Sequence, residues 1–208
     1  MSEVKTNKIS PRSGTAFTLG DSGDTFTVPS GTTLDIASGA TIDATGATAT
    51  GFGGNNTPAF QANFTTSQTL SDNVWTKMQA NTEDFDTDSA YDNSTNYRFT
   101  VPSGEGGKYF LYSRMTIISS GGSSYILGEQ FMQIRVNSET DTTARFFLQE
   151  KDYAGGYYKT LTLLGITDLA AADTVEFYAK SNVTNGYNSY IANDMRESVV
   201  GGYKMIGL

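Results

Sequence analysis

The chain has 208 residues, no cysteine, no histidine and a formal net charge of −8 at pH 7. The lack of histidine removes the commonest general base and metal ligand, the lack of cysteine removes disulfides and thiol chemistry, and the acidic balance argues against binding to nucleic acid or to an anionic membrane. Tyr and Phe, at twelve each, and abundant Thr, Ser, Gly and Asn suit strands and turns better than helices, so we predict an all-β fold.

The chain begins with a basic leader, which we place at residues 1–20. Its three basic residues are the last before Lys77. The first ten residues contain no apolar segment typical of a signal peptide, and no run approaches a membrane span in length, so we expect neither cleavage nor membrane insertion. The leader is either a disordered terminus or a docking segment for a larger partner. The docking candidates are Lys5, Lys8, Ile9 and Arg12.

Residues 21–57 contain an eight-residue repeat. Consecutive units occupy residues 25–32, 33–40 and 41–48, and each places two apolar residues two positions apart ahead of a turn rich in small residues. Apolar residues at i and i+2 point to one face of a strand, and so short a strand is not stable alone. The repeat therefore predicts a β-structured stalk made by intertwined identical chains, with a hinge at residues 53–56.

The remainder, residues 58–208, is a run of strand-forming segments separated by Gly, Asn, Ser and Asp turns, a spacing typical of a sandwich or jelly roll. The predicted strands are 59–64, 74–78, 97–101, 108–118, 129–137, 143–150, 159–164, 174–181 and 202–208. Apolar and polar residues alternate in 129–137 and 174–181, so one face of each should lie in the core.

Two shorter features of this region allow a structural interpretation. Residues 167–173 are the best candidate for a helix, although the segment is short. Trp75 is the only tryptophan and lies in a predicted strand between Val74 and Met78. We therefore expect Trp75 in the core rather than at a ligand site.

Several motifs follow one another along residues 58–208. They are Pro58-Ala-Phe-Gln-Ala62, Tyr91-Asp92, Tyr97-Arg-Phe-Thr-Val-Pro102, Gly107-Lys-Tyr-Phe-Leu-Tyr112, Asp173-Thr-Val-Glu-Phe177, Asn185-Gly-Tyr187 and Ser198-Val-Val-Gly-Gly-Tyr203. In this order they resemble the globular head of the complement and tumour-necrosis-factor superfamily, although Asn96 and Ala172 stand where the pattern usually has glycine. The resemblance implies a jelly-roll β-sandwich of about ten strands that assembles as a homotrimer, often on a thin stalk.

The layout of leader, repeat and head also resembles that of structural proteins of marine bacteriophages. This resemblance implies a virion protein, made in the host cytoplasm, whose leader docks on other virion proteins and whose head points outward.

The acidic segment 83–88, with Asp92 nearby, is the strongest candidate for chemistry. Asp84, Asp86 and Asp88 match positions 1, 3 and 5 of a calcium loop, but the glycine of position 6 and the glutamate of position 12 are missing. We expect a solvated acidic loop. The alternative is a looser calcium site formed by Asp84, Asp86, Asp88 and Asp92; no other cofactor is predicted.

No nucleophile motif or phosphate-binding loop accompanies these acidic residues. A glycosidase needs two carboxyl groups at a fixed separation. Nothing in the spacing selects such a pair from Glu105, Glu129, Glu150 and Asp152. We predict that the protein is not an enzyme.

Two loops combine Tyr with Gly and Asn, a mixture found in recognition loops because Tyr offers contact area at low entropic cost. The candidate receptor-binding residues are Tyr153, Tyr157, Tyr158, Asn185, Tyr187, Asn188 and Tyr190. The alternative is that these are ordinary β-turns, with Tyr covering sheet edges or packing against a trimer neighbour.

Three functions remain open at this point. The first is a homotrimeric tail fibre or spike whose head binds a protein or polysaccharide of the host cell surface. The second is a capsid-decorating or head-fibre protein with a structural role, and the third is a polysaccharide-cleaving appendage. The sequence favours the first two over the third and hardly separates them.

Overall fold

The structure of the chain is a computed structural model, which describes residues 14, 21, 23–41, 56–120, 126–151, 158–193 and 198–206, without the side chain of residue 185. The chain divides into two units, Met1–Ala49 and Thr50–Leu208. Over these described residues, no helix has both the length and the apolar character needed to cross a membrane.

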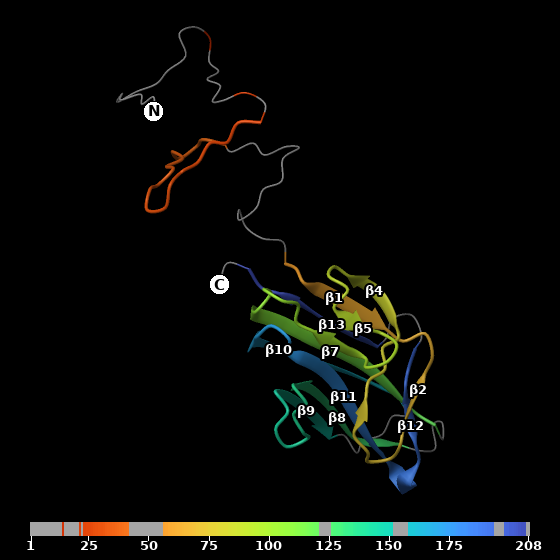
Figure 1. Ribbon diagram of the computed structural model, residues 1–208. Helices are drawn as coiled ribbons and strands as arrows, with labels where there is room; N and C mark the ends of the chain where they lie inside the picture. The colour runs from red at the N-terminus through yellow and green to blue at the C-terminus, as the bar shows by residue number, and fades with distance from the viewer. Residues whose placement is uncertain are drawn as a thin grey trace. The chain divides into compact units, whose positions relative to one another are not determined.

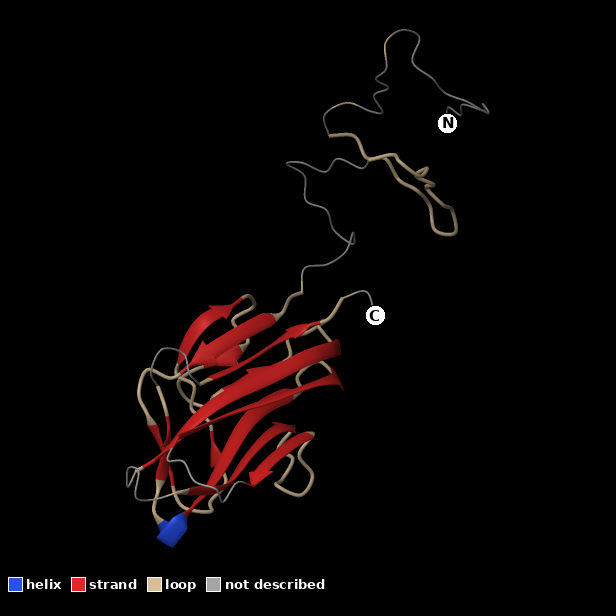
Figure 2. Ribbon diagram, turned by 180° about the vertical axis from the view of Figure 1, so that it is seen from behind, coloured by secondary structure: helices blue, strands red, loops and turns tan. Residues whose placement is uncertain are grey.

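The second unit is a sandwich of two antiparallel β-sheets, drawn in Figure 1 and, from behind, in Figure 2. The first, here called the A sheet, has seven strands. In spatial order they are β2 (Gln68–Leu70), β12 (Ser189–Ile191), β7 (Gly107–Ser119), β13 (Val199–Lys204), β1 (Ala59–Asn63) and β4 (Thr82–Asp86), with β10 (Tyr158–Leu169) paired along β7.

The second sheet, here called the B sheet, has six strands. Their order is β5 (Tyr91–Asp92), β6 (Arg98–Thr100), β11 (Thr174–Val183), β8 (Leu127–Val136) and β9 (Phe146–Lys151), with β3 (Thr76–Lys77) paired to β11. A 3₁₀ turn, Thr184–Gly186, follows β11. The predicted all-β fold is confirmed.

A cluster of aromatic rings fills the space between the sheets. Phe60 of β1 stacks on Tyr91 and on Phe99, with ring centroids 5.2 and 4.6 Å apart. Phe99 in turn lies 5.8 Å from Tyr109, and Phe60 lies 6.4 Å from Phe177. All five side chains are buried, and each belongs to one of the motifs recognised in the sequence. Those motifs therefore mark the core of the sandwich.

The alternating segments behave as their pattern predicts. On β11, Val175, Phe177 and Ala179 are buried, and they lie opposite Val136, Ile134 and Met132 of β8. Glu176, between two of them, points to the outer face. Six apolar residues from two strands thus close the core, because successive residues of a strand point to opposite faces.

The structure corrects the predicted helix at residues 167–173. Thr167 and the two residues after it continue β10 opposite β7, where Thr167 pairs with Tyr109. The next four residues form a turn, closed by the bond from the Asp173 amide to the Ala170 carbonyl (3.1 Å). Pairing along the full length of β7 outweighs the weak helical tendency of a short segment. Four short strands were also not predicted: β2, β4, β5 and β12.

The first unit contains turns at a regular interval of eight residues. Hydrogen bonds link the amides of Asp24, Thr32 and Ala40 to the carbonyls of Asp21, Pro29 and Ala37, at 3.0, 3.2 and 3.0 Å. The third residue of each turn is a glycine with positive φ: 95° at Gly23, 82° at Gly31 and 84° at Gly39. This is the geometry of a type II β-turn, which favours glycine at that position. The octad repeat is therefore a repeat of turns.

The apolar residues between these turns are exposed. Phe26, Val28, Leu34 and Ile36 leave 65, 39, 60 and 43% of their surface accessible. Residues 23–41 form no strand pairing within the single chain. The third octad, residues 41–48, lies largely outside the described residues, as does the hinge at 53–55. The multi-chain stalk stays a prediction.

Candidate functional site

An apolar stripe crosses the outer face of the A sheet. Ile166 of β10 lies opposite Phe110 of β7, and Phe110 lies opposite Tyr203 of β13. One step along, Leu164 lies opposite Tyr112. Leu164 and Ile166 are 58 and 53% exposed. We call these five residues the A-sheet stripe.

The stripe is held rigidly by its own contacts. The rings of Phe110 and Tyr203 are 5.4 Å apart, and those of Phe110 and Tyr112 are 6.1 Å apart. The Tyr112 hydroxyl donates to Oε1 of Gln61 at 2.6 Å. Its ring lies over Gly201, where a Cβ atom would come within 2.4 Å of the phenol. A glycine is required there for the tyrosine to lie flat on the sheet.

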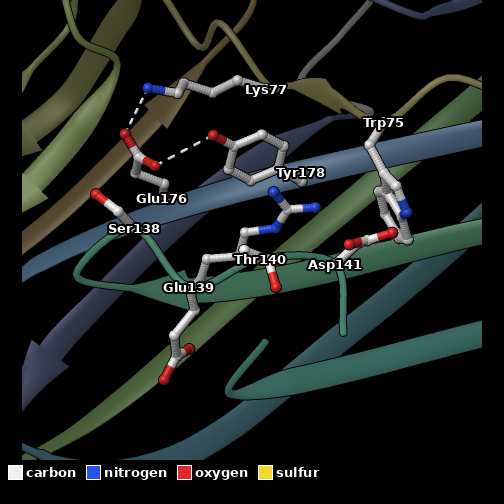
Figure 3. Close-up of a pocket in the computed structure, with 9 residues that line it drawn as sticks. Trp75, Lys77, Ser138, Glu139, Thr140, Asp141, Glu176 and Tyr178 are labelled. Carbon is white, nitrogen blue, oxygen red and sulfur yellow. Dashed lines mark hydrogen bonds and ion pairs between the residues drawn. The ribbon is translucent and has the colours of Figure 1, made fainter. Parts of the chain in front are cut away.

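The B sheet carries a cavity of about 520 Å³ on its outer side. Its walls come from β3, β8, β11 and the turn after β8, as Figure 3 shows. Trp75, Arg135 and Tyr178 provide the aromatic and cationic wall, and Glu139 and Asp141 belong to the turn. Three strands far apart in the sequence thus meet at one hollow.

Arg135 is the central group of this cavity. Its guanidinium carbon lies 3.8 Å from the centre of the Tyr178 ring and 5.5 Å from that of Trp75, so two aromatic rings stabilise the cation. Nε donates to Oε1 of Gln133 at 2.9 Å. Nη2 is buried and has no hydrogen-bond partner in the described structure. A buried donor without a partner is costly, and the two aromatic rings beside the guanidinium offset part of that cost.

Protein groups already satisfy two of the cavity's carboxylates. Glu176 accepts from Lys77 Nζ and, at 3.2 Å, from the Tyr178 hydroxyl. Burial raises the pKa of Tyr178, and the neighbouring Glu176 charge adds to the shift, so the phenol stays a donor at neutral pH. Glu139 accepts from Arg145 at 3.0 Å and from the Val136 amide at 3.0 Å.

The predicted tyrosines are only partly brought together. Tyr158 and Tyr190 both lie opposite Ile118, on either side of it in the A sheet. Tyr187 is 43% exposed. Asn188 is tied to neighbouring loops, since its Oδ1 accepts from the Asp72 amide at 3.3 Å. Tyr153 and Tyr157 lie outside the described residues, and so does the side chain of Asn185.

Residues 83–86 of the acidic segment belong to a strand rather than the expected loop, because residues 82–86 pair with β1, whereas Thr87 and Asp88 follow in a bend. Asp84 accepts from the side chains of Gln61 and Asn63, at 2.7 and 2.9 Å, and Asp86 accepts from the Tyr91 amide at 2.8 Å. These bonds fix the carboxylates to the edge of the A sheet.

The predicted calcium site also included Asp88 and Asp92. The Asp88 carboxylate accepts from the Thr87 hydroxyl at 2.6 Å. The pKa of Asp92 is well below its usual range because the amides of Thr95 and Ser94 and the side chain of Asn96 donate to it. Across the described ranges, no group of three or more acidic side chains is placed to hold a metal ion.

The other carboxylates considered for catalysis lie in ion pairs. Glu105 pairs with Lys204 at 2.9 Å, Glu129 with Lys151 at 2.8 Å and Glu150 with Lys159 at 2.9 Å. Asp152 lies outside the described residues, and so do the docking candidates Lys5, Lys8, Ile9 and Arg12.

The structure corrects the expected position of Trp75. Its indole is half-buried on the outer face of the B sheet, 5.9 Å from the Phe131 ring and 5.2 Å from Lys180 Nζ. The adjacent Val74 is 51% exposed. The alternation of apolar and polar residues in 129–137 predicted that Arg135 points away from the core. It did not predict the contact between Arg135 and Trp75, because the two residues are distant in the chain.

Comparison with known proteins bears on the fold alone. No family model matches the chain, and no curated protein matches it. Crystal structures of murine APRIL at pH 5.0 and pH 8.0 are similar, with 10 and 11% identity over 71% of this chain and 98% of theirs, and TM-scores of 0.50 and 0.51. The globular domain of zebrafish complement 1qA shares 15% identity over 73% of this chain and 99% of its own, at a TM-score of 0.47, and no conclusion rests on it. The predicted jelly-roll fold is confirmed.

Proposed function

We propose that this protein is a homotrimeric structural protein of a bacteriophage virion, a fibre or spike whose jelly-roll head binds the host cell surface. Its role is display and binding rather than catalysis. The leader, residues 1–20, docks on other virion proteins. The eight-residue repeat of residues 21–57, here called the octad unit, forms the stalk.

The A-sheet stripe carries this proposal. A contiguous row of half-buried aromatic and exposed aliphatic side chains is typical of a surface that another protein covers. Tyrosine and phenylalanine dominate the row, and their mutual contacts hold them in place, which lowers the entropic cost of association. Self-association also agrees with the homotrimer that the resemblance of the sequence motifs to complement and tumour-necrosis-factor heads implies.

The octad unit supports the same assembly independently. Its exposed apolar pairs recur every eight residues, with the same spacing as the turns. A neighbouring copy in the same register would therefore place its own apolar pair beside each of them. Within one chain, residues 23–41 form no strand pairing that would bury these apolar side chains. Three parallel copies would bury them against one another.

The test is the absolute mass of the purified full-length chain by light scattering. We expect a mass of three chains for the natural sequence and of one chain for Leu164→Lys with Ile166→Lys, because two charges would be buried in the interface. Phe147→Lys is the matched control, since Phe147 is 53% exposed on the B sheet; it should stay trimeric. A natural chain with the mass of one would overturn the trimer.

Attachment is tested separately from assembly. Purified trimers should bind host cells and compete with adsorption of the virion. If trimers form but deletion of the gene leaves infectivity intact and alters capsid robustness, the capsid-decorating role replaces the fibre.

A further inference from the structure

A second cavity, of about 440 Å³, is lined by residues of both sheets. They come from β2 and the loop before it, from β3 and the segment after it, and from the residue before β6. The lining consists of two glutamines, one asparagine, four serine or threonine residues and Tyr97. We call this the polar cavity and infer that it binds a neutral hexose unit of a polysaccharide. The inference rests on the proposed function in that it names the class of host molecule that the head contacts.

The lining of the polar cavity favours a neutral ligand. None of the described residues that line it carries a charge. Two cations are next to the lining in sequence, but both face other groups. Lys77 pairs with Glu176, and Arg98 lies opposite Asp92 on β5. A charged sugar would lose hydration here without gaining an opposite charge from the wall, which is costly, whereas a neutral sugar avoids this cost.

Several polar groups of the wall are left for a ligand. Within the described structure, the side chains of Thr69, Gln79 and Tyr97 make no hydrogen bond; the first two are exposed and the third is half-buried. A carboxamide offers donors and an acceptor, and a hydroxyl group both donates and accepts. These groups therefore match the adjacent hydroxyl groups of a sugar. The Tyr97 ring adds an apolar surface against which the C–H face of a hexose can pack.

Other side chains of the wall are used to hold the polar cavity in shape. Gln68 Nε2 donates to the Lys77 carbonyl at 2.7 Å, and its Oε1 accepts from the Gln79 amide at 2.8 Å. Asn81 bonds Thr65 twice, accepting from the amide at 2.9 Å and donating to Oγ1 at 2.8 Å. The strand, the loop before it and the opposite wall are thus joined before any ligand arrives, and such preorganisation lowers the entropic cost of binding.

The position of Tyr97 is also enforced by its surroundings. Its φ is 48°, in the left-handed region that a residue with a side chain seldom adopts. Lys77 Nζ donates to the Asn96 carbonyl at 3.2 Å, and the Asp92 carboxylate accepts from the amides of residues 94–96. Backbone strain of this kind persists where neighbouring bonds enforce it, and it occurs often at binding sites.

Calorimetric titration of the full-length protein measures the binding. The probes are neutral oligosaccharides of glucose, galactose, mannose and N-acetylglucosamine, with oligogalacturonate as the acidic probe. We expect saturable binding of at least one neutral oligosaccharide and none of the acidic one.

Two variants locate the binding. Gln79→Ala keeps the backbone amide that bonds Gln68, and Thr69→Val keeps the branched shape of a strand residue, so both should fold. Each should weaken binding about three- to tenfold, the effect of one neutral hydrogen bond. Gln149→Ala is the matched control, since Gln149 is exposed on β9 and does not line the polar cavity; it should bind as the natural chain does.

Each outcome decides the inference. Saturation by oligogalacturonate alone would overturn the neutral class, and unchanged affinity in both Gln79→Ala and Thr69→Val would place the sugar elsewhere. No saturable response to any of the probes in a protein with the mass of three chains would overturn the inference and leave the proposed assembly standing. A single-chain mass with normal sugar binding would do the reverse.

Discussion

Gly201 lies where the A sheet has no room for a side chain. A Cβ atom there would come within 2.4 Å of the Tyr112 ring and 2.9 Å of the Phe60 carbonyl oxygen. The ring could rotate away, but the backbone oxygen belongs to the neighbouring strand and cannot move without breaking the pairing of β1 with β13. One residue without a side chain thus keeps both the sheet and the A-sheet stripe in place.

We predict that Gly201→Ala lowers the free energy of unfolding by about 1–3 kcal/mol, the usual range for overpacking. Denaturant unfolding of the natural and variant chains measures this difference. Gly106→Ala is the control, since its Cβ would meet no atom closer than 3.4 Å. Equal loss in both variants would mean that crowding at Gly201 is not the cause.

Arg135 shows how much one residue's role depends on its neighbours. Its alternation on β8 predicts only that it points away from the core. Two rings, Trp75 and Tyr178, and the amide of Gln133 then determine where the guanidinium lies. The cation is thus stabilised on three sides, and its buried Nη2 has no hydrogen-bond partner in the described structure.

At the scale of elements, the octad unit and the head strands depend on different interactions. Each octad turn is closed by a bond between residues three apart, such as Thr32 to Pro29 at 3.2 Å. This local geometry needs only the glycine at the third position of the turn, where φ is positive. The head strands instead depend on partners far away in the chain, as β10 and β7 do.

We predict that Gly31→Ala and Gly39→Ala together destabilise the octad turns, because positive φ costs an L-residue about 1–2 kcal/mol. Hydrogen exchange at the amides of Thr32 and Ala40 should become faster. Ser30→Ala with Ser38→Ala changes the same turns at a position that does not require positive φ, and should leave exchange unchanged. Similar rates in all three proteins would contradict a role for these turns in the assembled stalk.

At the scale of the whole molecule, the two units can be separated. The head has its own core, which includes the aromatic cluster around Phe60, and its own exposed stripe. We predict that residues 58–208 alone keep the mass of three chains, measured by light scattering. A head that becomes monomeric while the full chain is trimeric would place assembly in the N-terminal unit.

The sequence by itself determined the fold class, the strand faces and the turns of the repeat. These follow from interactions within a few residues: apolar alternation in β8 and β11, and glycine where φ must be positive. Phe177 was expected to point inward from the alternation of its strand, whereas the structure showed that Phe60 and Phe99 of the recognised motifs lie in the core as well.

Only the tertiary structure decided which side chains on the outer faces of the sheets lie next to one another. Trp75 was expected in the core because its neighbours are apolar, yet it directly precedes β3, which pairs with the middle of β11, and its indole lies 5.5 Å from the Arg135 guanidinium on the outer face. The A-sheet stripe likewise joins residues of β7, β10 and β13. The register between distant strands places such side chains next to one another, and it results from packing of the whole sandwich, which no short stretch of sequence specifies.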